Sequence, residues 1–255
     1  MEHIEKASLK SQLGGGICLA EDTEDMFWLR ESDDYQSKVD LGNALARQYR
    51  FKEAAEAYRE ALDIRNDDAM TWLRLGGARL TLFRFDEAMD AFRGFLKCGG
   101  SEKAIAYHMG FWHYLNRTYG NGAKWFQKCL PCGGETRIAV IYWHTLCCLR
   151  GGMEPMLLEQ YAPDLEVDHH TAYKLAVSVL CGETSPEAAL VQIASVREDL
   201  NYGIALYGVL RHLDAAGQHK QAGELLDALL LRDGAWPNLS YLAAWQDKHQ
   251  KEYCE

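Results

Sequence analysis

The chain has 255 residues, 48% of them hydrophobic and 25% charged, and a formal net charge of −10. This is the balance of an ordinary soluble globular protein, and the length allows one large domain or two small ones. A chain this acidic repels the phosphate backbone of nucleic acids, so nucleic acid is not an expected partner.

The N-terminus reads Met-Glu-His-Ile-Glu-Lys and lacks the basic start and apolar run of a secretory signal. No stretch approaches the roughly 18 apolar residues that are needed to cross a bilayer. We therefore expect a cytoplasmic protein that has no membrane partner. The eight cysteines are then expected to be reduced and mostly buried.

The first 34 residues stand apart from the rest of the chain. Gly14-Gly15-Gly16 marks a flexible break, and residues 24–30 are expected to form a short turn that packs on the following helices. Residues 1–13 are compatible with a helix or a loose arm. We expect residues 1–34 to be an N-terminal segment that packs on the first repeat or precedes it.

A pattern of small and large residues recurs every 34 residues from Tyr35 onward, without insertions. The small positions are Gly42, Gly76 and Gly110, followed by Ala54, Ala88 and Gly122, and the large positions are Tyr58, Phe92 and Phe126. Small residues let paired helices approach closely, while the large residues are expected to fill the space between units. Apolar spacings of three and four residues predict helices of about 12 to 14 residues.

This pattern resembles the tetratricopeptide repeat family, most clearly in the second unit. Trp72, Leu75, Gly76, Ala88 and Phe92 occupy the family's first, second, third, sixth and seventh signature places. The departures from the family's pattern are Lys38, Asn66, Arg79 and His113. The resemblance implies an all-α fold, a right-handed superhelix of helix pairs that is closed by a C-terminal capping helix.

Beyond residue 135 the 34-residue spacing weakens. We expect helices over residues 138–150 and 170–181, a partner helix that begins within 155–161, and another helix that starts at Ser185-Pro186-Glu187. A clear unit returns between Leu206 and Leu230, and residues 239–251 are expected to form a last helix with a polar outer face. Residues 35–255 are thus expected to form a solenoid of about six helix pairs plus a cap.

The sharpest chemical constellation is Cys129-Leu-Pro-Cys132 followed by His144 and Cys148. A CxxC pair with a histidine and a cysteine one helical turn apart can hold zinc, and such a pair also suits thiol redox chemistry. The competing interpretation is core packing, because Cys129 takes the repeat position of Ala61. We favour core packing and expect no metal and no other cofactor.

Other candidate catalytic groups have simpler explanations. The adjacent pair His169-His170 does not share a helix face, so solvated or capping histidines are expected. Paired aspartates precede the helices, where they interact favourably with the N-terminal dipole. The sequence shows no phosphate-binding glycine loop, nucleophile elbow or convergent carboxylates, so we do not expect an enzyme.

The resemblance also implies a concave groove lined by the first helix of each unit. The implied lining is apolar and aromatic with two arginines, which suits an extended or helical peptide that carries apolar anchors and an acid. The implied binding residues are Asn43, Arg47, Leu73, Arg74, Tyr107, His108, Phe111 and Tyr114. The alternative is that these aromatic residues only pack between neighbouring units.

Some members of the family grip a C-terminal carboxylate with a clamp of lysine, asparagine and arginine. Its five places correspond here to Val39, Asn43, Arg74, Ala104 and His108. Only Asn43 matches, so a clamp for chaperone tails is not expected.

These observations predict a scaffold or adaptor that binds an unidentified protein or peptide in the groove. Two alternatives stay open. One is a regulatory solenoid that senses a signalling peptide or a small molecule, and the other is a metal-binding protein that uses the cysteine cluster.

Overall fold

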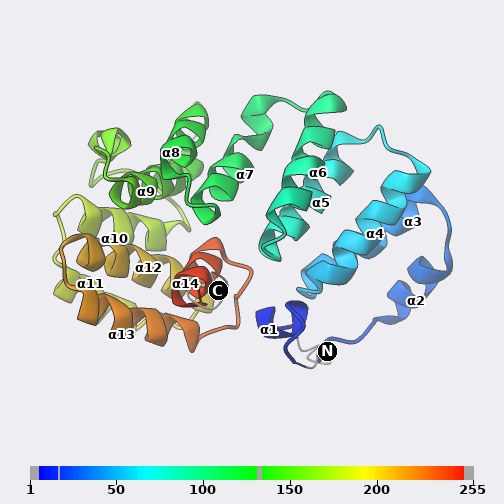
Figure 1. Ribbon diagram of the computed structural model, residues 1–255. Helices are drawn as coiled ribbons and strands as arrows, with labels where there is room; N and C mark the ends of the chain where they lie inside the picture. The colour runs from blue at the N-terminus through cyan, green and yellow to red at the C-terminus, as the bar shows by residue number, and fades with distance from the viewer. Residues whose placement is uncertain (1–5, 17, 131–133, 250–255) are drawn as a thin grey trace. The chain divides into compact units, whose positions relative to one another are not determined.

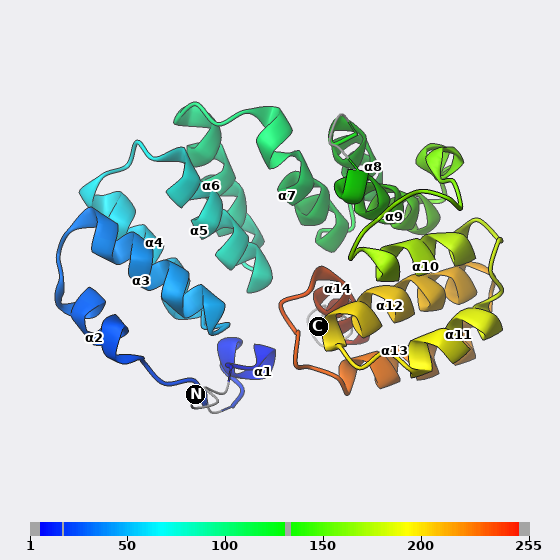
Figure 2. The same ribbon diagram turned by 180° about the vertical axis from the view of Figure 1, so that it is seen from behind.

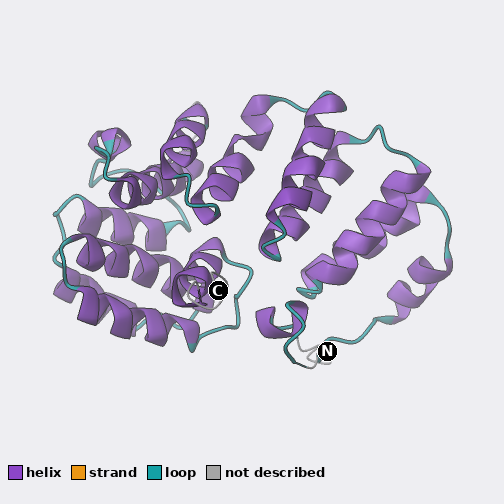
Figure 3. Ribbon diagram, in the orientation of Figure 1, coloured by secondary structure: helices purple, strands orange, loops and turns teal. Residues whose placement is uncertain are grey.

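Every regular element in the computed structural model, which describes residues 6–16, 18–130 and 134–249, is a helix (Figures 1 and 3). The expected all-α fold of repeated helices is thereby confirmed. The chain divides into two compact units, residues 1–105 and residues 106–255. Within the described ranges, no helix has the length and apolar character that crossing a membrane requires.

The first unit contains two short helices and two helical hairpins. Its helices are α1 (Leu9–Gln12), α2 (Glu24–Glu31), α3 (Tyr35–Arg47), α4 (Phe51–Ile64), α5 (Ala69–Thr81) and α6 (Phe85–Lys97). α3 packs against α4, α4 against α5 and α5 against α6 (Figure 1). The four hairpin helices have 13 or 14 residues, as the apolar spacing predicts.

Residues 34 positions apart begin and end the first helices of the hairpins. Asp34 accepts a hydrogen bond from the Ser37 amide at 3.0 Å, and Asp68 accepts one from the Thr71 amide at 3.1 Å, so both act as N-caps. At the hairpin turns, Tyr49, Phe83 and Arg117 adopt left-handed backbone with φ of 62°, 58° and 59°. The next amide then donates to a carbonyl five residues earlier, which closes each helix end.

Each of the first three hairpins is closed by an aromatic ring that lies on a glycine of the partner helix. Tyr58 lies on Gly42, and Phe92 lies on Gly76 in the same way. A β-carbon added at Gly110 would lie 2.6 Å from the ring of Phe126, which is closer than real contacts allow. Tyr58 also belongs to the core that the first hairpin shares with α5, where large residues between units were expected.

The N-terminal segment lies against the turn between α3 and α4. The Ala7 amide donates to the Gln48 carbonyl at 3.1 Å, and Gln12 Oε1 accepts from the Lys52 amide at 2.9 Å. Met26 of α2 is buried with 1% of its surface exposed.

An ionic cluster adds to these contacts. Asp22 pairs with Arg30 and Arg50, and both arginines also pair with Glu53. The hydrogen bond from Arg30 is the main cause that lowers the pKa of Asp22.

The second unit begins inside the helix that follows the second hairpin. Its elements are α7 (Glu102–Leu115), which crosses the boundary between the units, α8 (Tyr119–Lys128), α9 (Gly134–Gly151), the 3₁₀ helix η1 (Met156–Gln160), α10 (Thr171–Leu180), α11 (Pro186–Ala194), α12 (Asp199–Ala215), α13 (His219–Leu230) and α14 (Leu239–His249). α8 packs against α9, and α12 lies between α10 and α13 in both views (Figures 1 and 2).

Most helices that were expected beyond residue 135 are present, including α9, α10, α12 and α13. Ser185 caps α11 by accepting a hydrogen bond from the Ala188 amide at 3.2 Å. The expected partner helix at 155–161 is instead the single 3₁₀ helix η1, followed by a loop to residue 170. Pro163 explains the difference, because a proline cannot donate to a helix and disfavours helical backbone in the residue before it.

Trp143 of α9 forms the centre of the core of the second unit and has no exposed surface. Four aromatic rings from α7, α9 and α12 lie within 6.2 Å of it, centroid to centroid, and they belong to Phe111, Tyr114, Tyr142 and Tyr207. Aromatic contacts, three of them edge-to-face, therefore join α7, α9 and α12 in this core.

The last helix, α14, is joined to this core by polar side chains. Gln246 was expected on a polar outer face, but its amide donates to the Leu115 carbonyl at the end of α7 at 2.8 Å. Lys248 is exposed, as expected. Residues 250 and 251 of the expected helix lie outside the described residues, and the division at residue 34 stays a prediction.

Adjacent glycines on α5 allow a test of the ring contact. Gly76→Ala is expected to lower the free energy of unfolding by about 2 kcal/mol, because Phe92 must move to admit the methyl group. Gly77→Ala is the matched control. A methyl group there meets no atom within 4 Å, and the loss of a helical glycine should raise stability by about 0.5–1 kcal/mol. Urea unfolding curves of the two variants should shift in opposite directions, and a shift in the same direction would contradict the prediction.

Candidate functional site

Three of the expected groove residues come together around the hydroxyl group of Tyr58 in the first unit. Asn43 Oδ1 accepts a hydrogen bond from the Tyr58 hydroxyl at 3.0 Å, and Arg47 Nε donates to the Asn43 carbonyl at 3.2 Å. Burial raises the pKa of Tyr58 to about 12, while the nearby charges of Arg74 and Arg47 act in the opposite direction. α3 and α5 thus place an amide and two guanidinium groups near one phenol.

The two helices are tied together at their N-terminal ends. The Tyr35 hydroxyl of α3 donates to Asp68 Oδ2 at 2.6 Å and lies 2.8 Å from the hydroxyl of Thr71 on α5. These bonds hold the two first helices in a fixed register, which positions the side chains further along them.

Residues at helical spacing surround the two arginines. On α5 they are Met70, Leu73, Arg74 and Gly77, and on α3 they are Asn43 and Arg47. We call these six residues the α3/α5 face. Met70 is 48% exposed, and open space lies above Gly77, so the face offers apolar surface and accessible backbone beside its charges.

The arginines of this face carry charges that the described part of the chain does not neutralise. Arg47 is exposed, Arg74 is half-buried, and neither forms an ion pair within the described ranges. Most other arginines of the first unit are paired with a carboxylate, as Arg59 is with Asp63 at 2.7 Å. Two unpaired arginines on one face are therefore unusual for a chain with net charge −10.

Two of the four expected groove residues of the second unit lie inside its core. Phe111 and Tyr114 are each 2% exposed and contact Trp143. The half-buried ring of Tyr107 lies edge-on to Phe111 at 4.7 Å, and burial lowers the pKa of the half-buried His108. These contacts fit the alternative that the aromatic residues pack between helices, while a binding role for them stays a prediction.

The cysteine cluster shows no metal site in the ranges that the structure describes, where no three histidine, cysteine or acidic residues lie together as ligands. Cys132 lies outside those ranges. Cys129 is 3% exposed and its thiol contacts the Trp125 carbonyl at 3.5 Å, while Cys148 Sγ lies 3.8 Å from the ring nitrogens of His144. Burial raises the pKa of Cys148 to about 11 and lowers that of His144 to about 4, so the pair is neutral near pH 7.

The sequence did not predict a cluster of arginines that lies in the second unit. Asp247 of α14 is 9% exposed at its side chain and lies 2.7 Å from Arg150 and 3.4 Å from Arg211. The Tyr207 hydroxyl donates to Asp247 at 3.0 Å. These residues lie up to 97 positions apart on three helices, so no local spacing could have indicated the cluster.

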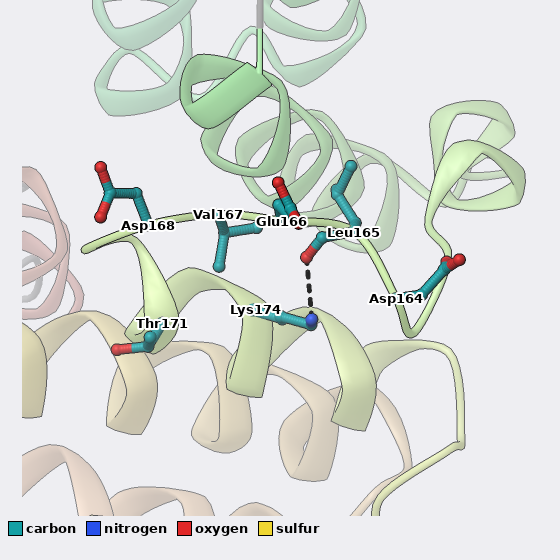
Figure 4. A pocket seen from close by; sticks show the side chains of 7 residues that line it. All are labelled: Asp164, Leu165, Glu166, Val167, Asp168, Thr171 and Lys174. Carbon is teal, nitrogen blue, oxygen red and sulfur yellow. Dashed lines mark hydrogen bonds between the residues drawn. The ribbon is translucent and has the colours of Figure 1, made fainter.

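A cavity lies beside the loop before α10 and has a volume of about 610 Å³. Its lining residues are Asp164, Leu165, Glu166, Val167, Asp168, Thr171 and Lys174. Figure 4 shows Asp164 and Asp168 at opposite ends of the loop, with Lys174 donating to the Leu165 carbonyl at 2.8 Å. The carboxylates do not converge on one point, so this cavity lacks the arrangement of a catalytic or metal site.

The hairpins at the 34-residue spacing define a helical-repeat protein. No protein-family model matches the chain, and no curated protein matches it. Among solved structures, the chain is similar to YrrB, described as a TPR protein with an unusual peptide-binding site. The identity is 16% and the TM-score 0.47, over 89% of this chain and 98% of that one. The function proposed below therefore rests on the residues of this chain.

Burial of His144 predicts a specific dependence of stability on pH. The folded pKa of about 4 lies below the ordinary value of 6.5, so between these values the unfolded chain binds a proton that the folded chain does not. Stability falls as the pH falls through this window, by about 2 kcal/mol between pH 7.5 and pH 5. Urea unfolding of the His144→Gln variant should lack this contribution. An unchanged pH dependence in that variant would contradict the assignment.

The Asp247 cluster predicts a large difference between two aspartates. Asp247→Asn leaves Arg150, only 11% exposed, without its carboxylate, so the free energy of unfolding should fall by about 3–5 kcal/mol. Asp227→Asn removes the 58% exposed partner of Lys248 and should change stability by less than about 0.5 kcal/mol. Equal effects in chemical denaturation would show that Asp247 is not a structural counter-ion.

Proposed function

We propose that this chain is a peptide-binding repeat protein and that the α3/α5 face recognises an acidic group of its partner. The observation that carries the proposal is the pair of unpaired arginines, Arg47 and Arg74, held beside Asn43 and Tyr58 on two helices that are fixed to each other. Guanidinium groups bind carboxylates in a defined, planar geometry, which gives both affinity and orientation.

Apolar side chains next to the charges support a peptide as the partner. On α5, Met70 lies one helical turn before both Leu73 and Arg74. An apolar side chain of the peptide would pack on them while its acidic group pairs with the arginines. Such a combination of an apolar anchor with a charge pair is common in peptide recognition.

The negative net charge of the chain makes this proposal more specific. The chain has 37 acidic and 27 basic residues, so it repels acidic peptides in general. A peptide with one acidic residue next to an apolar one would bind locally, whereas a strongly acidic peptide would be rejected. Selectivity would then come from repulsion as well as attraction.

The test is a display library of short peptides selected against the full chain, followed by affinity measurements on the selected peptide. Arg74→Glu and Arg47→Glu should each weaken binding at least about ten-fold, because they place a like charge opposite the acid of the peptide. Arg93→Glu is the matched control, since Arg93 of α6 is 65% exposed and paired with Asp90 outside this face. Selected peptides that lack an acid, or bind the Glu variants unchanged, would refute the proposal.

A further inference from the structure

A second pocket in the molecule, within the second unit, is lined by three arginines. It has a volume of about 380 Å³ and lies among the turn between α7 and α8, the start of α8 and the C-terminal ends of α9 and α12. The lining residues are Arg117, Tyr119, Leu149, Arg150, Arg211, Asp214 and Ala215. We call this space the arginine pocket. Its volume falls in the range of small-molecule sites.

The charges in and behind this pocket do not balance. Among the residues that the structure describes, three guanidinium groups face only two carboxylates, those of Asp247 and Asp214. Arg150 pairs with Asp247 at 2.7 Å, and Arg211 divides its donors between Asp214 at 2.7 Å and Asp247 at 3.4 Å. The second oxygen of Asp214 lies 2.7 Å from His219 Nδ1. Within the described part of the chain, one positive charge is therefore left without a counter-charge in a partly buried space.

Two guanidinium nitrogens of this pocket are buried and have no hydrogen-bond partner among the described residues, namely Arg117 Nη2 and Arg211 Nε. Arg117 Nη2 lies 3.8 Å from Asp247, which is beyond hydrogen-bond distance. A buried donor that has given up water without gaining a partner is unfavourable. An acidic group that enters the pocket would supply the missing negative charge.

The backbone at Arg117 gives a separate reason to look for a role outside packing. The equivalent left-handed residues of the first two hairpins are Tyr49 and Phe83, and the last hairpin has Gly217 with φ of 80°. Glycine suits this conformation best, while other residues adopt it at a cost. The turn therefore requires a left-handed backbone conformation but does not require an arginine. The third hairpin nevertheless has Arg117 at this position, where its side chain lines the pocket.

We propose that the arginine pocket binds one carboxylate group of a small organic acid. The single uncompensated positive charge matches a group of one negative charge, and the planar carboxylate matches the donors of Arg117 and Arg211. Tyr119 and Leu149 supply an apolar wall for the rest of the ligand. A phosphate dianion fits less well, because its second charge would face Asp247 and Asp214. This site is separate from the α3/α5 face and does not depend on it.

In the first experiment the full chain is titrated with benzoate, benzamide and inorganic phosphate. Binding is measured by calorimetry and by changes in NMR chemical shifts. Benzoate should bind saturably, and benzamide, which has the same shape without the charge, at least ten-fold more weakly. Phosphate should bind more weakly than benzoate. Absence of benzoate binding, equal binding of benzamide, or tighter binding of phosphate would each overturn the proposal.

The second experiment separates a ligand-binding role of Arg117 from a structural one. Arg117→Gly removes the side chain and relieves the left-handed backbone, so the melting temperature should stay or rise while benzoate affinity falls at least ten-fold. Arg117→Gln repeats the loss of charge with a long side chain retained and should weaken benzoate equally. Arg197→Gln, at an exposed arginine outside the pocket, is the charge-matched control. Unchanged benzoate affinity in both Arg117 variants would refute the site, whereas unchanged affinity in Arg74→Glu is expected.

Discussion

The fold depends on one repeated close contact, an aromatic ring lying on a glycine of the facing helix. At Gly42, Gly76 and Gly110 the missing β-carbon lets the second helix come near enough for its ring to cover the backbone of the first. The contact fixes both the distance between the helices and their rotation, because only one ring position fills the space. Everything that the first helices carry, including the arginines at Arg47 and Arg74, is positioned by these hairpins.

The 34-residue spacing predicts the hairpins because the residues that begin, end and pair the helices of a hairpin lie close together in the sequence. Helix caps such as Asp34 and Asp68, and a proline start such as Ser185-Pro186, act within a few residues. Two predictions failed for different reasons. The helix expected after residue 155 shortens to η1 because of the nearby Pro163, whereas Gln246 turns from an expected solvent face towards a distant partner at the end of α7. For the site, Asn43, Arg47 and Arg74 could be located from the repeat, but the arginine pocket could not, since Arg150 and Asp247 are 97 residues apart.

The two proposed sites show how burial decides what an arginine does. On the α3/α5 face the guanidinium groups keep part of their hydration, so they gain from a partner without harming the fold when it leaves. In the second unit, Arg150 and Arg211 are largely removed from water, and the fold itself must supply Asp247 as their counter-ion. The same side chain is thus a proposed recognition element in one place and a structural counter-ion in the other. The side chain of Arg117 is 32% exposed, which is intermediate between the hydrated arginines of the α3/α5 face and the buried arginines of the second unit.

The attachment of the N-terminal segment has a consequence for how the first unit opens. The segment is held by the hydrogen bond from the Ala7 amide to the Gln48 carbonyl, by a few buried apolar residues such as Leu9 and Met26, and by the cluster around Asp22 and Arg50. Among the described residues it buries fewer apolar side chains than the first hairpin does. Local opening costs the least free energy where buried apolar contacts are fewest. The amides of α1 should therefore exchange with deuterium before those of α3 to α6, through an opening that leaves the glycine and ring contacts closed. In the first unit, the N-terminal segment should therefore open at a lower free-energy cost than the helical hairpins.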